Sequence, residues 1–236
     1  MTKLPGLVGA LAECDERERA TLDHVARVIR EAGLIPTTKR GSGAADMTLT
    51  AAANLLIAAN TGGIPKAAAM TVIQYRTLVP RNTGQPDPKD GIYAHISTAR
   101  DFGQAVEFLI EGAPKLLRAF ADDMDVIYGG HQPDALYRLK TEMLNFGKFA
   151  GVEVTFAGPT PYAIIRIVPP GAKEPAQYQW EFMADVDLVM EGFYQEVRSD
   201  RRYTVTVGLK TLNKLFAAVS DEDDVATGDS ADTIDA

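Results

Sequence analysis

The stretch GVEVTFAGPTPYAIIRIV, residues 151–168, decides the fold class. Val152, Val154 and Phe156 alternate with polar or small residues, which is the period of a strand with one buried face. A break containing two prolines follows, and the run from Tyr162 to Val168 is rich in β-branched residues. Two strand-like segments joined by so short a break predict an antiparallel pair.

The same alternation returns twice further along the chain, before helical spacing closes it. The alternating apolar positions are Tyr178, Trp180 and Phe182, and then Tyr203, Val205 and Val207. Leu209, Leu212, Phe216 and Val219 then recur at the spacing of one helical face. We therefore expect about four antiparallel strands followed by a final helix.

The sequence before residue 151 has helical periods throughout. A first amphipathic helix is predicted over Glu16–Ala32, ended by Gly33 and Pro36. Thr48 is a suitable N-cap for a second helix, which the Asn60-Thr61-Gly62-Gly63 turn ends. A third is expected from Pro65 to Pro80, with Met70, Ile73 and Leu78 buried.

Three more helices are expected between the third helix and the strands. Thr98 is placed to cap one that runs to about Glu111, and Pro114 to begin another that reaches Phe120. A further amphipathic helix is marked by Leu136, Leu139, Met143 and Phe146.

These patterns predict an α+β protein in four parts. Residues 1–80 form a helical module and residues 81–91 a Pro- and Gly-rich linker. Residues 92–220 form the α+β domain, which we expect to mediate oligomerisation or to bind a partner or ligand. Residues 221–236 form an acidic tail that is too polar to pack and is expected to be disordered.

The charge of the chain is unevenly placed. The net charge is −8, from 24 Lys and Arg against 32 Asp and Glu. The segment from Asp221 to Ala236 holds seven acids and no base. From Ala32 to Gln85, by contrast, five bases stand against the single acid Asp46, a net charge of +4. The low overall pI therefore conceals a mildly basic region.

No constellation of residues points to catalysis, a metal or a cofactor. His24, His95 and His131 lack Cys or carboxylate neighbours at ligand spacing, and Cys14 is the only cysteine. The carboxylates in ADDMD, residues 121–125, lack the spacing of a calcium loop. We expect a cytoplasmic chain that is not an enzyme, with no disulfide and no membrane span.

The basic region contains the clearest functional signal, in the stretch REAGLIPTTKRGSGAADMT, residues 30–48. Phosphate binding needs cations, small hydroxyl donors and a backbone that can come close. We predict a nucleic-acid-binding set in which Arg27 and Arg30 extend the stretch along the preceding helix. Its members are Arg27, Arg30, Thr37, Thr38, Lys39, Arg40, Ser42 and Thr48.

The passage VIREAGLIPTTKRGSGAADMTLTAAANLLI, residues 28–57, resembles the helix-wing-helix passage of MerR-type winged helix-turn-helix regulators. It is also similar to uncharacterised prophage-associated proteins that share a Gly-Leu-x-Pro, basic-Gly, Met-Thr and Ala-Asn-Leu-Leu order. The resemblance extends from about Thr21 to Leu78. It implies that Lys39 and Arg40 are wing contacts to phosphate and that Thr48 caps the next helix.

Our leading expectation is a phage-type protein that binds double-stranded DNA, as a homo-oligomeric transcriptional regulator or in packaging or replication. Two alternatives stay open. The basic stretch can be the solvated loop of a helical hairpin. The working part can instead be the α+β half, in a protein-interaction or assembly factor that uses a spare strand edge and no nucleic acid.

Overall fold

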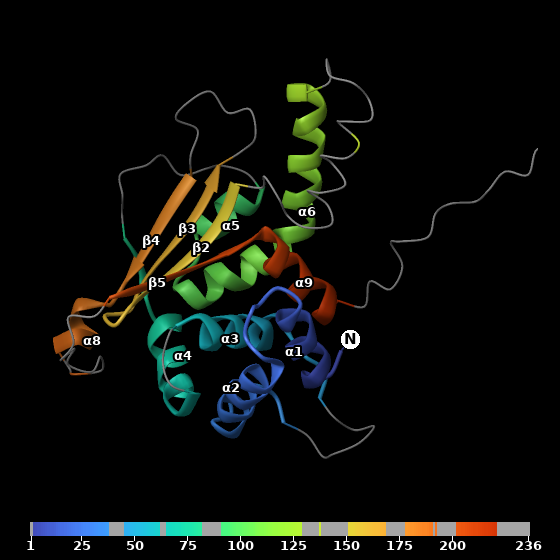
Figure 1. The fold of residues 1–236 in the computed structure, drawn as a ribbon. Helices are drawn as coiled ribbons and strands as arrows, with labels where there is room; N and C mark the ends of the chain where they lie inside the picture. The colour runs from blue at the N-terminus through green and yellow to red at the C-terminus, as the bar shows by residue number, and fades with distance from the viewer. Residues whose placement is uncertain are drawn as a thin grey trace, which may run out of the picture.

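The computed structural model describes residues 2–37, 45–61, 65–81, 91–128, 137, 151–168, 178–190, 192 and 202–220. The fold is α+β, with an antiparallel sheet packed against helices (Figure 1). The described strands form one sheet in the order β1-β4-β3-β2-β5. They are β1 (Val79–Arg81), β2 (Gly151–Gly158), β3 (Tyr162–Val168), β4 (Tyr178–Met183) and β5 (Tyr203–Gly208).

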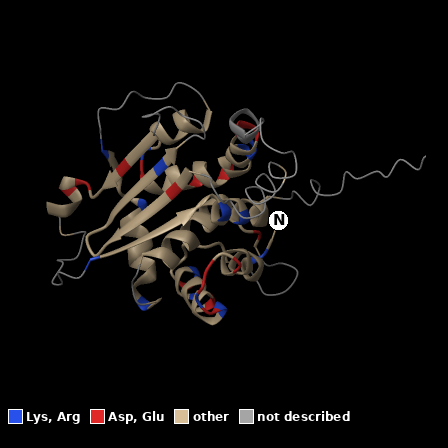
Figure 2. Ribbon diagram, turned by 45° about the horizontal axis from the view of Figure 1, so that its top comes forward, with Lys and Arg blue, Asp and Glu red and all other residues tan. Residues whose placement is uncertain are grey.

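The hairpin predicted from residues 151–168 is confirmed. β2 and β3 pair antiparallel, with Val154 opposite Ile165. Alternate side chains of both strands are buried, so one face of the sheet belongs to the core. The other face carries charged pairs, among them Arg166 with Glu153 and Arg81 with Glu181. Figure 2 shows both signs of charge on these strands.

The first strand corrects the expectation that the N-terminal helices run into a linker at residue 81. β1 pairs with β4, placing Val79 opposite Met183 and Arg81 opposite Glu181. Pro80 has no N–H to donate, which suits a short strand at the edge of a sheet. The described sheet therefore has five strands, one more than expected, and the extra strand comes from the N-terminal part.

The N-terminal helices are α1 (Leu4–Ala12), α2 (Arg19–Glu31), α3 (Leu49–Asn60) and α4 (Ala68–Arg76), with a 3₁₀ turn at Pro65–Ala67 before α4. The predicted end of α2 is confirmed. Gly33 has φ +76°, the Leu34 N–H donates to the Ile29 carbonyl at 2.9 Å, and the Gly33 N–H donates to Arg30 at 3.0 Å. This is the Schellman motif, which needs a left-handed residue just after the helix.

The buried face of α4 differs from the prediction. Met70 and Ile73 are 48% and 37% exposed, whereas Ala68, Val72 and Tyr75 are buried. These three lie at positions i, i+4 and i+7 of the helix, so the inward face is rotated from the one expected. Leu78 is fully buried, as predicted.

Two helices lie between β1 and β2, α5 (Gly91–Ser97) and α6 (Phe102–Tyr128). The prediction of separate helices capped by Thr98 and begun by Pro114 is wrong, because α6 continues through Pro114. The cap is Asp101, whose Oδ1 accepts the Gln104 N–H at 2.8 Å. Leu109, Leu116 and Phe120 are buried on both sides of the proline, so packing keeps the helix together.

The chain closes with α8 (Val186–Met190) and α9 (Leu209–Val219), the second as predicted. Side chains from both halves of the chain, such as Leu7, Phe102, Phe156 and Leu215, belong to one hydrophobic core. The division near residue 80 stays a prediction. The predicted linker at 82–90, the helix marked by Leu136 to Phe146 and the acidic segment 221–236 lie outside the described residues.

Candidate nucleic-acid interface

The surface predicted to bind nucleic acid begins on the exposed side of α2. Leu22, Val25, Ala26 and Ile29 of this helix are buried, whereas Arg27 and Arg30 are exposed. The two arginines lie three residues apart, so their side chains are neighbours on the helix surface. The amphipathic pattern of α2 therefore presents both guanidinium groups to solvent.

Arg27 and Arg30 line one groove between α1 and α2. Its volume is about 540 Å³, and Leu4 and Val8 of α1 contribute its apolar wall. Asp23 lies in the same groove and is 3.9 Å from Arg19. In the part of the chain that the structure describes, neither Arg27 nor Arg30 forms an ion pair.

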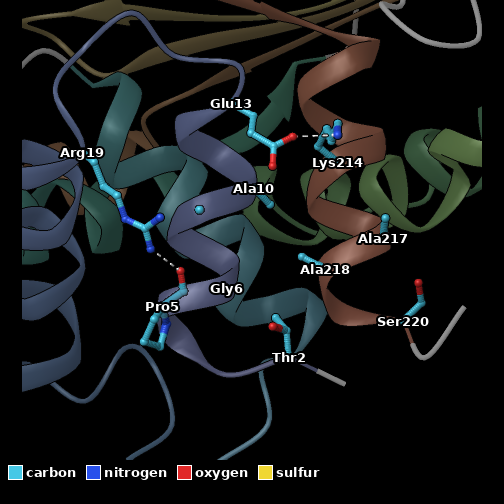
Figure 3. Close-up of a pocket in the computed structure, with 11 residues that line it drawn as sticks. Thr2, Pro5, Gly6, Ala10, Glu13, Arg19, Lys214, Ala217, Ala218 and Ser220 are labelled. Atoms are coloured by element: carbon cyan, nitrogen blue, oxygen red, sulfur yellow. Dashed lines mark hydrogen bonds and ion pairs between the residues drawn. The ribbon is translucent and has the colours of Figure 1, made fainter. Parts of the chain in front are cut away.

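Two other grooves differ in that their charged side chains satisfy one another. Figure 3 shows the groove between α1 and α9, where Glu13 and Lys214 are 2.7 Å apart and Arg19 donates to the Pro5 carbonyl at 2.8 Å. The groove beside β5 holds Arg17, which pairs with Asp15 and donates to the Ala59 carbonyl. Among the grooves described here, the one between α1 and α2 therefore offers arginines with spare charge.

The acids of α2 reduce its positive charge. The helix carries Arg19, Arg27 and Arg30 against Asp23 and Glu31, and Figure 2 shows both signs of charge on the N-terminal helices. A ligand that requires strong positive potential thus needs the basic residues that follow α2 as well.

The basic segment after α2 starts from a fixed point. Ile35 is buried and Thr37 is exposed, so the chain leaves the core just before the segment. Thr38, Lys39, Arg40 and Ser42 lie outside the described residues, and their predicted roles stay predictions.

The segment also returns to a fixed point. Lys3 Nζ lies 2.7 Å from Asp46 Oδ1, and this contact lowers the pKa of the Asp46 carboxyl. The Met47 N–H donates to the Thr2 carbonyl at 3.0 Å. Thr48 is exposed and its Oγ1 accepts the Ala51 N–H at 3.2 Å, which confirms it as the N-cap of α3. Asp46, the one acid between Ala32 and Gln85, is thus paired.

Sequence reasoning missed a buried polar network beneath this segment. Asn54 of α3 donates to the Leu34 carbonyl at 2.6 Å and accepts from Arg76 of α4 at 2.9 Å. Arg76 also donates to Glu107 of α6 at 2.6 Å. The available signal was an asparagine in the apolar run AAANLLIAA, since a buried amide needs hydrogen-bond partners.

The structure gives the histidines and the cysteine no partner that suggests chemistry. His95 packs against the ring of Phe108 at 5.5 Å, and burial raises the pKa of the half-buried Cys14 thiol. Within the described ranges, no three His, Cys, Asp or Glu side chains gather as a metal site would require. Across those same ranges, no helix has the length and apolar character needed to cross a membrane.

The geometry thus defines an α+β protein with an arginine-bearing groove between its first two helices. Neither a protein-family model, nor a curated protein, nor a solved structure matched the chain. Function must therefore be argued from the site.

Proposed function

We propose that this protein binds double-stranded DNA through the exposed side of α2 and the basic segment that follows it. The observation that carries the proposal is the pair Arg27 and Arg30, exposed side by side in one groove without an ion-pair partner among the described residues. Cations in this state can displace counterions from phosphates, which is the main source of affinity for duplex DNA.

The contact surface would be α2 rather than α3. Every residue from Ala51 to Asn60 of α3 is buried, so that helix has no side chain free to reach a groove of DNA. The two ends of the basic segment are held by α2 and by the Thr48 cap, and Lys39 and Arg40 lie between them.

The biological role proposed from the resemblance to prophage proteins is transcriptional regulation in a mobile element, with packaging or replication as its closest variant. A homo-oligomer would present two such surfaces, which doubles the number of phosphate contacts and suits a two-fold symmetric site.

The test is a fluorescence-anisotropy titration of the full chain with random duplex DNA at several salt concentrations. We expect affinity to fall steeply with salt. Replacing Arg27 and Arg30 together with Ala should weaken binding to all sequences and reduce the slope of log Kd against log salt by about 2, since each lost phosphate contact removes about 0.9.

The matched control is Lys115→Ala with Arg118→Ala on α6. These are also two exposed cations three residues apart on one helix, so the net charge changes equally. Equal losses in the two double variants would show a non-local charge effect and contradict the proposed surface. An unchanged Kd in the α2 variant would contradict it directly.

A second candidate is protein interaction through the sheet, because β5 pairs only with β2 among the described strands. Its other edge faces a groove of about 490 Å³ and is a surface to which a partner strand can add. A partner that stays bound after nuclease treatment would favour this function. Thr204→Lys should then release it, because Thr204 is exposed and a charge on an edge strand opposes pairing.

A further inference from the structure

The carbonyl that precedes the basic segment is held by a chain of hydrogen bonds from three helices. Asn54 Nδ2 donates to the Leu34 carbonyl at 2.6 Å, Arg76 donates to Asn54 Oδ1 at 2.9 Å, and Arg76 also donates to Glu107 at 2.6 Å. Leu34 is the last residue of the Schellman turn, three residues before Thr37. The chain therefore links the start of the basic segment to α3, α4 and α6.

The network leaves Asn54 little freedom. Its residue is 3% exposed, and the side chains of Arg76 and Glu107 are 20% and 23% exposed. The guanidinium of Arg76 lies against Gly103, where an added Cβ would come within 2.7 Å of Arg76 Cζ. Each amide group of Asn54 thus has one fixed partner, which is the arrangement that orients a loop rather than one that tolerates several positions.

We propose that Asn54, held by Arg76 and Glu107, is a positioning residue for the nucleic-acid surface: it fixes where the basic segment leaves the core. The inference rests on the proposed function, and it adds residues that touch no DNA. The return of the segment is fixed separately, by the Met47–Thr2 hydrogen bond, the Lys3–Asp46 pair and the Thr48 cap. Loss of the Asn54 contact therefore releases one end of the segment only.

The chain offers a matched control on the same helix. Asn60 of α3 is 5% exposed and its Nδ2 donates to the Leu56 carbonyl at 2.8 Å. Asn54→Ala and Asn60→Ala therefore each remove one buried amide and one hydrogen bond to a backbone carbonyl. Only the first of these carbonyls precedes the basic segment.

The experiment compares the full native chain with Asn54→Ala, Asn60→Ala, Lys39→Ala/Arg40→Ala, and the triple variant that combines the first and third changes. Random duplex DNA is the probe, titrated at several salt concentrations. We expect Asn54→Ala to weaken binding and to reduce the salt slope by up to about 2, the loss expected from removing both basic side chains. In the triple variant, the Lys39 and Arg40 changes should add little further loss, because the two defects act on the same contacts.

Hydrogen exchange supplies a reading that needs no DNA. Peptides covering residues 34–37 should exchange faster in Asn54→Ala than in Asn60→Ala. Should Asn54→Ala fail to fold, Arg76→Lys replaces it, because a lysine ammonium cannot span Asn54 and Glu107 as the planar guanidinium does. Arg76→Lys should then show the same reduced salt slope.

The outcomes separate the two claims. A native chain that fails to bind duplex DNA overturns the proposed function and this inference with it. A native chain that binds, with equal salt slopes and equal exchange at residues 34–37 in Asn54→Ala and Asn60→Ala, overturns this inference alone. Fully additive losses in the triple variant also overturn it.

Discussion

Gly33 and Gly9 illustrate how position decides what a glycine contributes. Gly33 has φ +76° and no atom within 4 Å of an added Cβ, so Ala there is opposed by backbone strain alone. We expect Gly33→Ala to lower the free energy of unfolding by about 1 kcal/mol, and Gly33→Asn by less, because Asn tolerates the left-handed region better. Chemical denaturation in urea measures both.

Gly9→Ala is the contrasting substitution. Gly9 lies inside α1, and its added Cβ would lie 3.4 Å from the Arg19 guanidinium, an ordinary contact with a flexible side chain. We expect this change to raise the unfolding free energy by up to about 1 kcal/mol, the difference in helix propensity. A loss at Gly9 equal to that at Gly33 would contradict the assignment of strain to Gly33.

Local chemistry explains which residues sequence reasoning placed correctly. Gly33 and Thr48 end and begin helices through bonds to residues at most five positions away, so their roles can be predicted from the sequence. Asn54 could not be placed in this way. Its partners Leu34 and Arg76 lie 20 and 22 residues away, and only the packing of α2, α3 and α4 brings them together.

At the scale of elements, Tyr75 joins α4 to the sheet. Its hydroxyl donates to the Ala157 carbonyl of β2 at 2.6 Å, and its ring lies 6.2 Å from that of Phe156. Tyr75→Phe removes the donor and leaves the carbonyl of a central strand with one partner fewer. We expect the free energy of unfolding at pH 7 to fall by about 1 to 2 kcal/mol.

Tyr75 also predicts a loss of stability at alkaline pH. Burial raises the pKa of its hydroxyl in the folded state, with nearby Tyr203 as a smaller cause. Below the ordinary tyrosine pKa of about 10, both states are neutral and the contribution is fully present. Above it, the unfolded state releases a proton that the folded state retains, so stability falls with pH.

Urea unfolding of native protein and Tyr75→Phe between pH 8 and about 11 checks this sign. The variant should lose less stability over that range than the native chain. Some loss should remain, because burial also raises the pKa of Tyr93 and Tyr162. Parallel curves for the two proteins would show that Tyr75 does not titrate as its burial implies.

The elements that the sequence misplaced are those decided by packing. Pro114 is a strong local signal for a helix start, but buried side chains on both sides of it keep α6 continuous. Val79–Arg81 has only three residues and becomes a strand because β4 lies beside it. Strands β2 to β5 were predictable because their alternation is long enough to specify a face.

At the scale of the whole molecule, charge separates the acidic segment 221–236 from the rest. A chain ending at Ser220 keeps all 24 bases and loses seven of the 32 acids, so its net charge changes from −8 to −1. Every described core residue lies before this point. We expect its melting temperature to match that of the full chain and its affinity for duplex DNA at low salt to be up to about tenfold higher.

The salt dependence distinguishes this effect from a new contact. The two affinities should converge as salt rises, because screening weakens the repulsion between the acidic segment and phosphate. A difference that persists at high salt, or equal affinities at low salt, would contradict a purely electrostatic role. The prediction concerns the sequence of the segment and assumes nothing about its conformation.

The α+β class followed from two periods that change near residue 151, and the structure confirms it. The exposure of Arg27 and Arg30 followed from the amphipathic pattern of α2. The groove they share did not, because its other wall comes from α1, and the sequence does not specify how two helices pack.

The packing of α1 on α9 has a consequence for synthesis in the cell. The two helices are in contact, and Glu13 just after α1 is linked to Lys214, 201 residues later. Leu7, Val8 and Leu11 therefore keep part of their apolar surface uncovered until the ribosome has released residues 209–219. The emerging polypeptide is thus a substrate for holding chaperones during most of its translation, and its earliest helix is among the last to reach its native neighbours.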